Sequence, residues 1–301
     1  MKPVDFDLHQ PATLDAALAL LAGHGDEARV LAGGQSLVPL LNFRLARPGH
    51  VVDIGRVAGL GELRGTPDGL VIGAMVRQSH AERAPEVAAA CPLLAAALPW
   101  IAHPPIRARG TICGSLAHAD PAAELPAVAV ALDATFVAVS ASGRREIPAA
   151  GFYQAYLTTA LRPDELLAAV RFPAAPPGTG AAFEEVSRRR GDFAMAGVAV
   201  QVTLEDGAIA DARIAISGVA GVPLRCAGSE QVLLGSAADP GDLRRAADAA
   251  LDILDPAGDL HATAGYRKHV AGVLLRRAVA GAYGRAARPA DTAATGQPGR
   301  G

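Results

Sequence analysis

The N-terminal part of the chain alternates segments of helical apolar spacing with short apolar runs. Residues 14–21 place leucine and alanine on one face of a predicted helix, which begins after the capping residue Thr13 and ends at Gly23. Further helices are expected at 37–41, 79–98 and 122–132. The second of these contains Pro85 and Pro92, so it is interpreted as two helices. Short apolar runs predict strands, at 28–31, 51–54, 70–76, 135–139 and 166–172.

The pattern changes at residues 173–180, whose sequence PAAPPGTG has no apolar periodicity and predicts a linker. Beyond it the predicted strands come first and the predicted helices follow. The strands are expected at 181–186, 198–204 and 212–217, and the helices at 240–254 and 262–285. Strands and helices alternate before the linker, so the order of elements favours two α+β units.

The composition limits the class of protein. With 50% hydrophobic and 19% charged residues, a sizeable core is expected and wholesale disorder is excluded. A net charge of −2 gives no electrostatic footprint for nucleic acid. Cys91, Cys113 and Cys226 form no C-x-x-C pair and the eight histidines are scattered, so no disulfide framework, iron–sulfur cluster or metal site is expected. Without a signal peptide or a membrane span, a cytoplasmic location is expected.

Two loops of small residues are candidates for binding an anion. The first, AGGQS at 32–36, follows a predicted strand and precedes a predicted helix, so its backbone N–H groups could converge on a pyrophosphate. The second, TICGS at 111–115, adds two hydroxyl groups. Each loop alone could be a plain turn, and the pair is more suggestive than either. A leucine at Gly34 is expected to block the approach of the phosphate.

Several familiar enzyme motifs do not occur in this sequence. It has neither the G-x-G-x-x-G dinucleotide fingerprint nor a P-loop, which disfavours a Rossmann domain and a nucleotide hydrolase. It has no G-x-S-x-G motif for acyl transfer either. No catalytic residue is assigned.

Taken together, the loops resemble those of the FAD-binding medium subunit of molybdenum hydroxylases, the carbon monoxide dehydrogenase and xanthine dehydrogenase family. Three motifs carry the resemblance: LAGGQSL at 31–37, RGTICGSLAHADP at 109–121 and RRRGDFA at 188–194. Their order and joint presence make the resemblance specific, and it covers residues 3–285.

The resemblance implies a fold of the α+β class. It predicts a PCMH or vanillyl-alcohol-oxidase-type FAD-binding domain over 1–176, made of two α+β subdomains at about 1–57 and 58–176. A smaller C-terminal α+β domain of the carbon monoxide dehydrogenase flavoprotein type is expected over 177–286. The tail at 287–301, rich in proline, glycine and small residues, is expected to be disordered.

The resemblance also implies roles for individual residues in FAD binding. The first loop would cradle the pyrophosphate and the second would lie along the flavin and phosphates. Glu124 would hold the ribityl chain, and Ile101 and Leu167 would line the cofactor. The implied cofactor-binding residues are Leu31, Ala32, Gly33, Gly34, Gln35, Ser36, Ile101, Thr111, Gly114, Ser115, Asp120, Glu124 and Leu167. His118 and Asp120 could form a proton relay or simply order their loop.

The sequence departs from the family pattern in two places. Cys113 stands where the family usually has glycine, so a need for positive φ there would cost roughly 1–2 kcal/mol. We expect it to be an inert substitute rather than a redox-active thiol. Glu184 and Glu185 occupy a segment where relatives often carry a lysine, whose role Arg188 or Arg189 could take.

The function implied by the resemblance is electron transfer. FAD would receive electrons from 2Fe–2S centres of a small partner subunit, after substrate oxidation at the molybdenum cofactor of a large one, and pass them to an external acceptor. A dimer of heterotrimers is the implied assembly. Two alternatives are a stand-alone flavin oxidoreductase, which would turn over without partners, and an assembly subunit that has lost its cofactor.

Overall fold

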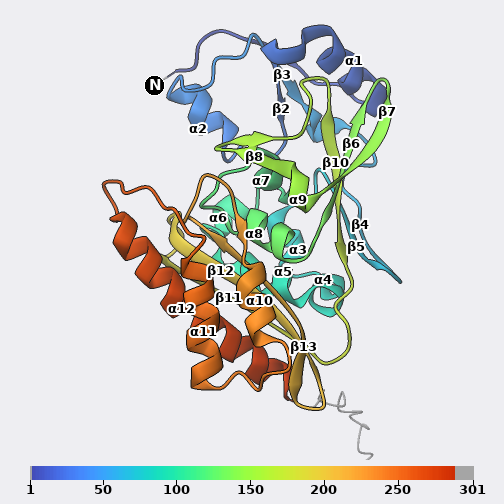
Figure 1. Cartoon of the computed structure of the whole chain (residues 1–301). Helices are drawn as coiled ribbons and strands as arrows, with labels where there is room; N and C mark the ends of the chain where they lie inside the picture. The colour runs from blue at the N-terminus through green and yellow to red at the C-terminus, as the bar shows by residue number, and fades with distance from the viewer. Residues whose placement is uncertain (1, 289–301) are drawn as a thin grey trace, which may run out of the picture.

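The structure is a computed structural model that describes residues 2–288 (Figure 1). Its strands form sheets of three, five and four strands and one two-stranded ribbon. Helices and strands are mixed throughout, so the α+β prediction is confirmed. Apart from residues 287 and 288, the tail expected to be disordered lies outside the described residues. Between residues 2 and 288, no helix is long and apolar enough to cross a membrane.

A three-stranded parallel sheet, with the strand order β1-β3-β2, forms the N-terminal unit at the top of Figure 1. Its elements are β1 (Asp7–His9), α1 (Leu14–His24), β2 (Ala28–Leu31), α2 (Leu37–Asn42) and β3 (His50–Asp53). α1 begins as predicted, since Thr13 Oγ1 accepts a hydrogen bond from the backbone N–H of Ala16 at 3.2 Å. It does not end at Gly23, because the chain leaves the helix only at Gly25, where φ is +51°.

An antiparallel sheet with the strand order β4-β5-β10-β6-β7 forms the middle of the molecule. Its strands are β4 (Leu63–Thr66), β5 (Gly69–Gly73), β6 (Thr135–Ser140), β7 (Gly143–Pro148) and β10 (Leu166–Pro173). A short helix and a ribbon connect β7 to β10: α9 (Ala149–Phe152), β8 (Tyr153–Ala155) and β9 (Thr158–Thr159). β10 therefore reaches the centre of the sheet after a long connection.

Six short α-helices lie between β5 and β6. They are α3 (Gln78–Ala81), α4 (Pro85–Ala90), α5 (Pro92–Ala97), α6 (Pro104–Arg107), α7 (Ile112–His118) and α8 (Glu124–Ala131). The stretch interpreted as two helices is three, because Pro85 and Pro92 each begin a new helix at its first turn. α8 begins two residues later than expected.

The C-terminal part is an antiparallel sheet of four strands covered by helices. Its elements are β11 (Thr179–Ser187), β12 (Ala194–Glu205), β13 (Ala208–Ser217), β14 (Leu224–Arg225), α10 (Ala227–Leu233), α11 (Pro240–Leu251) and α12 (Ala264–Ala286). α12 lies along β11 and β12, while α5 and α8 of the preceding part pack on the same sheet (Figure 1). The two parts therefore share a packed interface, in addition to their separate apolar cores.

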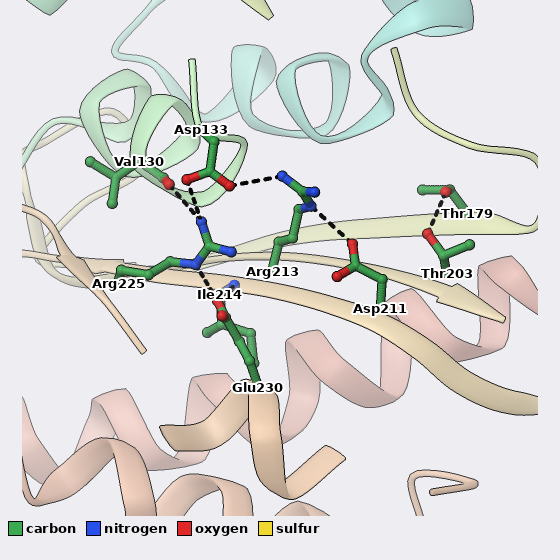
Figure 2. Close-up of polar contacts among 9 residues, drawn as sticks. All are labelled: Val130, Asp133, Thr179, Thr203, Asp211, Arg213, Ile214, Arg225 and Glu230. Carbon is green, nitrogen blue, oxygen red and sulfur yellow. Dashed lines mark hydrogen bonds and ion pairs between the residues drawn. The ribbon is translucent and has the colours of Figure 1, made fainter. Parts of the chain in front are cut away.

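Charged side chains tie the two parts together at one end of this interface (Figure 2). Asp133 follows α8, and its two carboxylate oxygens accept hydrogen bonds from Arg213 at 2.9 Å and from Arg225 at 3.1 Å. Arg225 also donates to the carbonyl of Val130 at 3.0 Å and pairs with Glu230. These contacts fix the C-terminal sheet against the end of α8.

Candidate functional site

A cavity of about 1350 Å³ lies where the three sheets approach one another. Its lining includes both small-residue loops, the apolar residues Ile101 and Leu167, and the segment that follows β11. Every cofactor-binding residue expected from the sequence lines this cavity except Leu31. The structure thus brings together residues that are widely separated along the chain.

Two adjacent glycines shape the first loop for different reasons. A Cβ atom at Gly33 would lie 2.4 Å from the carbonyl oxygen of Arg109 and 2.8 Å from the Cα of Gly110. The bare backbone at Gly33 therefore lets the first loop touch the start of the second. Gly34 has a φ of +74°, a conformation that favours glycine.

The structure shows a further reason why a leucine at Gly34 would disturb the first loop. A Cβ there would face the side chains of Val38, at 3.2 Å, and Leu31, at 3.4 Å. A substitution at Gly34 would thus act through backbone strain and crowding against α2. Leu31 lies behind the loop, which explains why it does not line the cavity.

The second loop is built around the N-terminus of α7. Thr111 is the N-cap: it is only 2% exposed, and its Oγ1 accepts a hydrogen bond from the backbone N–H of Gly114 at 3.0 Å. A Cβ at Gly114 would lie 2.6 Å from that oxygen, so a side chain there would displace the cap. The hydroxyl of Thr111 keeps its proton free to donate toward the cavity.

Cys113 fits its position without strain. It lies within α7 and is not among the residues with positive φ, so the cost considered for a left-handed conformation does not arise. Its Sγ donates to the carbonyl of Ile72 at 3.5 Å, and burial raises the pKa of the thiol to about 12. A thiol that stays protonated is a poor nucleophile and a poor redox centre.

Two buried carboxyl groups stand close to the cavity. Glu124, which lines it, is 8% exposed at the first turn of α8, and burial raises its pKa to about 7. Glu185 of β11 is also 8% exposed, and its Oε2 has no hydrogen-bond partner among the residues that the structure describes. Burial, and then the nearby Glu124, raise its pKa to about 8.

The sequence marks Glu185 only as a departure from a family pattern. A signal for its burial is nevertheless present in the sequence, since strand alternation places it on the same face as Ala181 and Phe183.

Arg107 is a further residue that supports the site and that the sequence did not indicate. It is 8% exposed and forms a two-bond pair with Glu82. Arg107 also donates to the carbonyl of Ile101 at 2.8 Å and so holds this cavity residue in place.

Asp120 and His118 both line the cavity after α7. Asp120 Oδ1 accepts a hydrogen bond from the backbone N–H of Ala122 at 2.9 Å, which orders the loop before α8. Burial lowers the pKa of His118. The geometry supports the loop-ordering role for Asp120.

The C-terminal part supplies charged and aromatic groups to the cavity. Arg188 and Arg189 are exposed and line it, as does Phe193, whose side chain is 67% exposed. Arg267 of α12 anchors this side by donating to the carbonyls of Met195 at 2.7 Å and Gly218 at 3.1 Å.

The cavity suits an elongated, anionic cofactor. Its volume of about 1350 Å³ exceeds the roughly 300–1,000 Å³ of an ordinary ligand pocket, as an extended dinucleotide requires. One part is lined by bare loop backbone, another by Ile101 and Leu167, and arginines stand at the C-terminal side. The residues present therefore fit FAD.

Comparison with known proteins agrees with this geometry. The family model described as the FAD binding domain in molybdopterin dehydrogenase matches residues 4–175, and the CO dehydrogenase flavoprotein C-terminal domain matches residues 181–282. The chain is 45% identical to the 6-hydroxypseudooxynicotine dehydrogenase complex subunit alpha of Paenarthrobacter nicotinovorans, over 95% of this chain and 97% of the relative. It is 40% identical to the carbon monoxide dehydrogenase medium chain of Hydrogenophaga pseudoflava, over 95% of this chain and all of the relative.

A solved structure of carbon monoxide dehydrogenase from Hydrogenophaga pseudoflava superposes on the chain with a TM-score of 0.92 and 41% identity. The superposition covers 95% of this chain and 99% of the other. The two family models leave only short segments of the chain unmatched. The chain therefore belongs to the family of FAD-binding medium subunits of molybdenum-dependent dehydrogenases, and is an oxidoreductase subunit with FAD as its cofactor.

Proposed function

We propose that this chain transfers electrons, through FAD, from the 2Fe–2S centres of a partner subunit to an external acceptor. The observation that carries the proposal is the cavity of about 1350 Å³ to which both glycine loops and the C-terminal part contribute. The three cysteines of the sequence are free and buried, and they lie far apart along the chain, so they form no cluster for an iron–sulfur centre. In this proposal the electrons therefore reach the cavity from another subunit.

The residues of the cavity have distinct binding tasks in this proposal. Backbone N–H groups of residues 32–36 hold the pyrophosphate, with hydroxyl groups from Thr111 and Ser115 completing the anion site. Glu124 accepts hydrogen bonds from the ribityl chain, and Ile101 and Leu167 pack against the flavin ring. Bound FAD supplies the one- and two-electron chemistry that links the two kinds of redox partner.

Glu124 has a second task because it can hold a proton. Since its pKa is about 7, its carboxyl group is protonated in a large fraction of molecules at neutral pH. It can therefore donate or accept a proton at the cavity wall. Glu185, whose pKa is raised to about 8 by burial and by Glu124, is a second carboxyl group that can hold a proton near neutral pH.

The proposed partners are a molybdenum-cofactor large subunit and a 2Fe–2S small subunit, arranged as a dimer of heterotrimers in the cytoplasm. The names of the relatives support a shared complex, since they are called a complex subunit and a medium chain. The relatives differ in the substrate that their names give, since they include caffeine dehydrogenase and carbon monoxide dehydrogenase subunits.

The test is an absorbance spectrum of the chain, mixed with FAD and desalted, alone and after co-expression with the neighbouring genes. Flavin bands with added iron–sulfur absorption in the co-purified sample, and bleaching of the flavin by substrate only in that sample, would support the proposal. Turnover by the chain alone would indicate a stand-alone oxidoreductase. Protein without flavin in both samples would indicate an assembly subunit.

A further inference from the structure

Three histidines that are scattered along the sequence meet at one edge of the N-terminal sheet. His9 is the last residue of β1, His24 the last of α1 and His50 the first of β3. The parallel register pairs Asp7 with His50, so strand alternation puts the side chains of Asp7, His9 and His50 on one face. None of the three histidines lines the cofactor cavity.

The three imidazole rings are in close contact. His9 Nε2 lies 3.2 Å from His50 Nδ1, and the ring of His24 stacks on that of His50 with centroids 3.6 Å apart. One nitrogen from each ring can be chosen so that all three lie within 4.8 Å of one another. The side chains are partly buried, so the cluster is open to a small ion and shielded on one side.

The separation between His9 and His50 matches that between two ligands of a tetrahedral metal ion. Two nitrogens bound to one zinc ion at about 2.0–2.1 Å lie about 3.3 Å apart, close to the 3.2 Å between His9 and His50. The carboxylate Oδ2 of Asp7 lies 3.5 Å from His50 Nδ1, and this side chain is 77% exposed and free to turn. We propose that His9, His24 and His50 form a binding site for a divalent transition metal, Zn²⁺ above all, with Asp7 or water as the fourth ligand.

His24 must reorient for this site to form. Its ring is only 24° from parallel to that of His50, and the in-plane lone pairs of two stacked rings do not converge on one ion. Rotation about the side-chain bonds of His24 would make this change, since the residue is partly buried at the last position of α1, between two glycines.

A metal bound here would join β1, α1 and β3, the segments that support the first glycine loop. Residues 25–31 run directly from His24 through β2 to that loop. The role is structural, and it does not depend on the electron-transfer proposal, because the site is separate from the cavity.

The experiment uses the full-length chain, without a polyhistidine tag and stripped with a chelator. Titration with ZnCl₂ should show one Zn²⁺ per chain with a Kd below about 10 µM. Saturating Zn²⁺ should raise the Tm by roughly 5 °C, since it binds the folded state selectively. His9→Gln and His24→Gln should each weaken binding at least tenfold, while His80→Gln, at an exposed histidine outside the cluster, should leave it unchanged.

A second measurement needs no variant. Co²⁺ in a tetrahedral site of nitrogen and oxygen ligands absorbs visible light far more strongly than hexaaqua Co²⁺, so the wild-type chain should develop this absorption and lose it on adding Zn²⁺. No such absorption and no Zn²⁺ binding, or binding equal in wild type and His24→Gln, would overturn the proposal and leave a hydrogen-bonded histidine cluster. FAD content, read at the same time from the flavin bands, separates this result from any failure of cofactor binding.

Discussion

The two sides of the cofactor cavity differ in the chemical groups that shape them. On the N-terminal side, two loops bring bare backbone to the cavity: Gly33 sets one loop against Arg109, and Thr111 caps the helix that follows. On the C-terminal side, Arg188 is exposed and lines the cavity, and Glu185 is buried in β11 three residues before it. Changes in the two loops should therefore act through shape at any pH, and changes at Glu185 through charge.

The largest effect is expected from Gly33→Ala. The new Cβ would lie 2.4 Å from the carbonyl oxygen of Arg109, so the two loops must separate. Overpacking of this kind costs roughly 1–3 kcal/mol, and FAD affinity should fall at least tenfold. Flavin fluorescence titration and thermal unfolding measure the two effects.

Gly23→Ala is the matched control for that substitution. Gly23 lies inside α1, and apart from its chain neighbours and the nearby backbone of the helix itself, no atom of the described residues stands within 4 Å of the place that an added Cβ would take. Alanine should therefore stabilise the helix by roughly 0.5–1 kcal/mol and leave FAD binding unchanged. Wild-type FAD affinity in Gly33→Ala would show that contact between the loops does not shape the site.

Thr111→Val should have the next largest effect. It removes the oxygen that accepts from the N–H of Gly114 while keeping a similar shape, and loss of an N-cap costs roughly 0.5–2 kcal/mol. Chemical denaturation should show this loss equally at pH 6 and pH 9. Thr111→Ser restores the hydroxyl and should restore most of the stability, and a loss that varied with pH would contradict a capping role.

Glu185→Gln tests the C-terminal side, where charge is expected to matter. Burial raises the pKa of Glu185 to about 8 in the folded chain, from an ordinary value of 4.5. Between pH 4.5 and pH 8 the folded state therefore keeps a proton that the unfolded state has lost. The contribution of this group to the free energy of unfolding falls as the pH rises through that range.

The glutamine variant cannot ionise, so it should be more stable than wild type by roughly 1–2 kcal/mol at pH 9 and about equal at pH 5. Denaturant unfolding at both pH values measures the difference. Glu184→Gln, at the neighbouring half-buried position, is the control. An identical pH profile for wild type and Glu185→Gln would mean that the carboxylate finds a partner or water.

Local signals in the sequence were enough for much of the fold. The cap at Thr13 and the apolar spacing after it indicated α1, and the strand before the first loop is present as β2 (Ala28–Leu31). Such features depend on a few neighbouring residues. α10 (Ala227–Leu233) was missed because it is short and contains glycine and serine, which are weak helix formers.

Features that depend on distant contacts could not be predicted. Nothing near Gly33 in the sequence indicates that it must pass the carbonyl of Arg109, and nothing near Glu185 indicates that Glu124 lies beside it. The histidine cluster is a third case, because His24 and His50 meet only through the packing of α1 on the sheet. The resemblance to a family identified the residues of the cavity but not the reasons for their identity.

The smallest effect is expected from Cys113→Ala, although Cys113 lines the cavity within the second loop. The thiol is buried and protonated, with a pKa of about 12, so its removal should cost roughly 1 kcal/mol in packing and change FAD affinity less than twofold. In the wild-type chain it should resist iodoacetamide at pH 8 until the protein unfolds, as should the buried Cys91 and Cys226. Mass spectrometry after labelling measures this. Rapid modification of Cys113 alone, with loss of FAD, would show that the N-terminal side of the cavity opens in solution and that backbone shape alone does not define it.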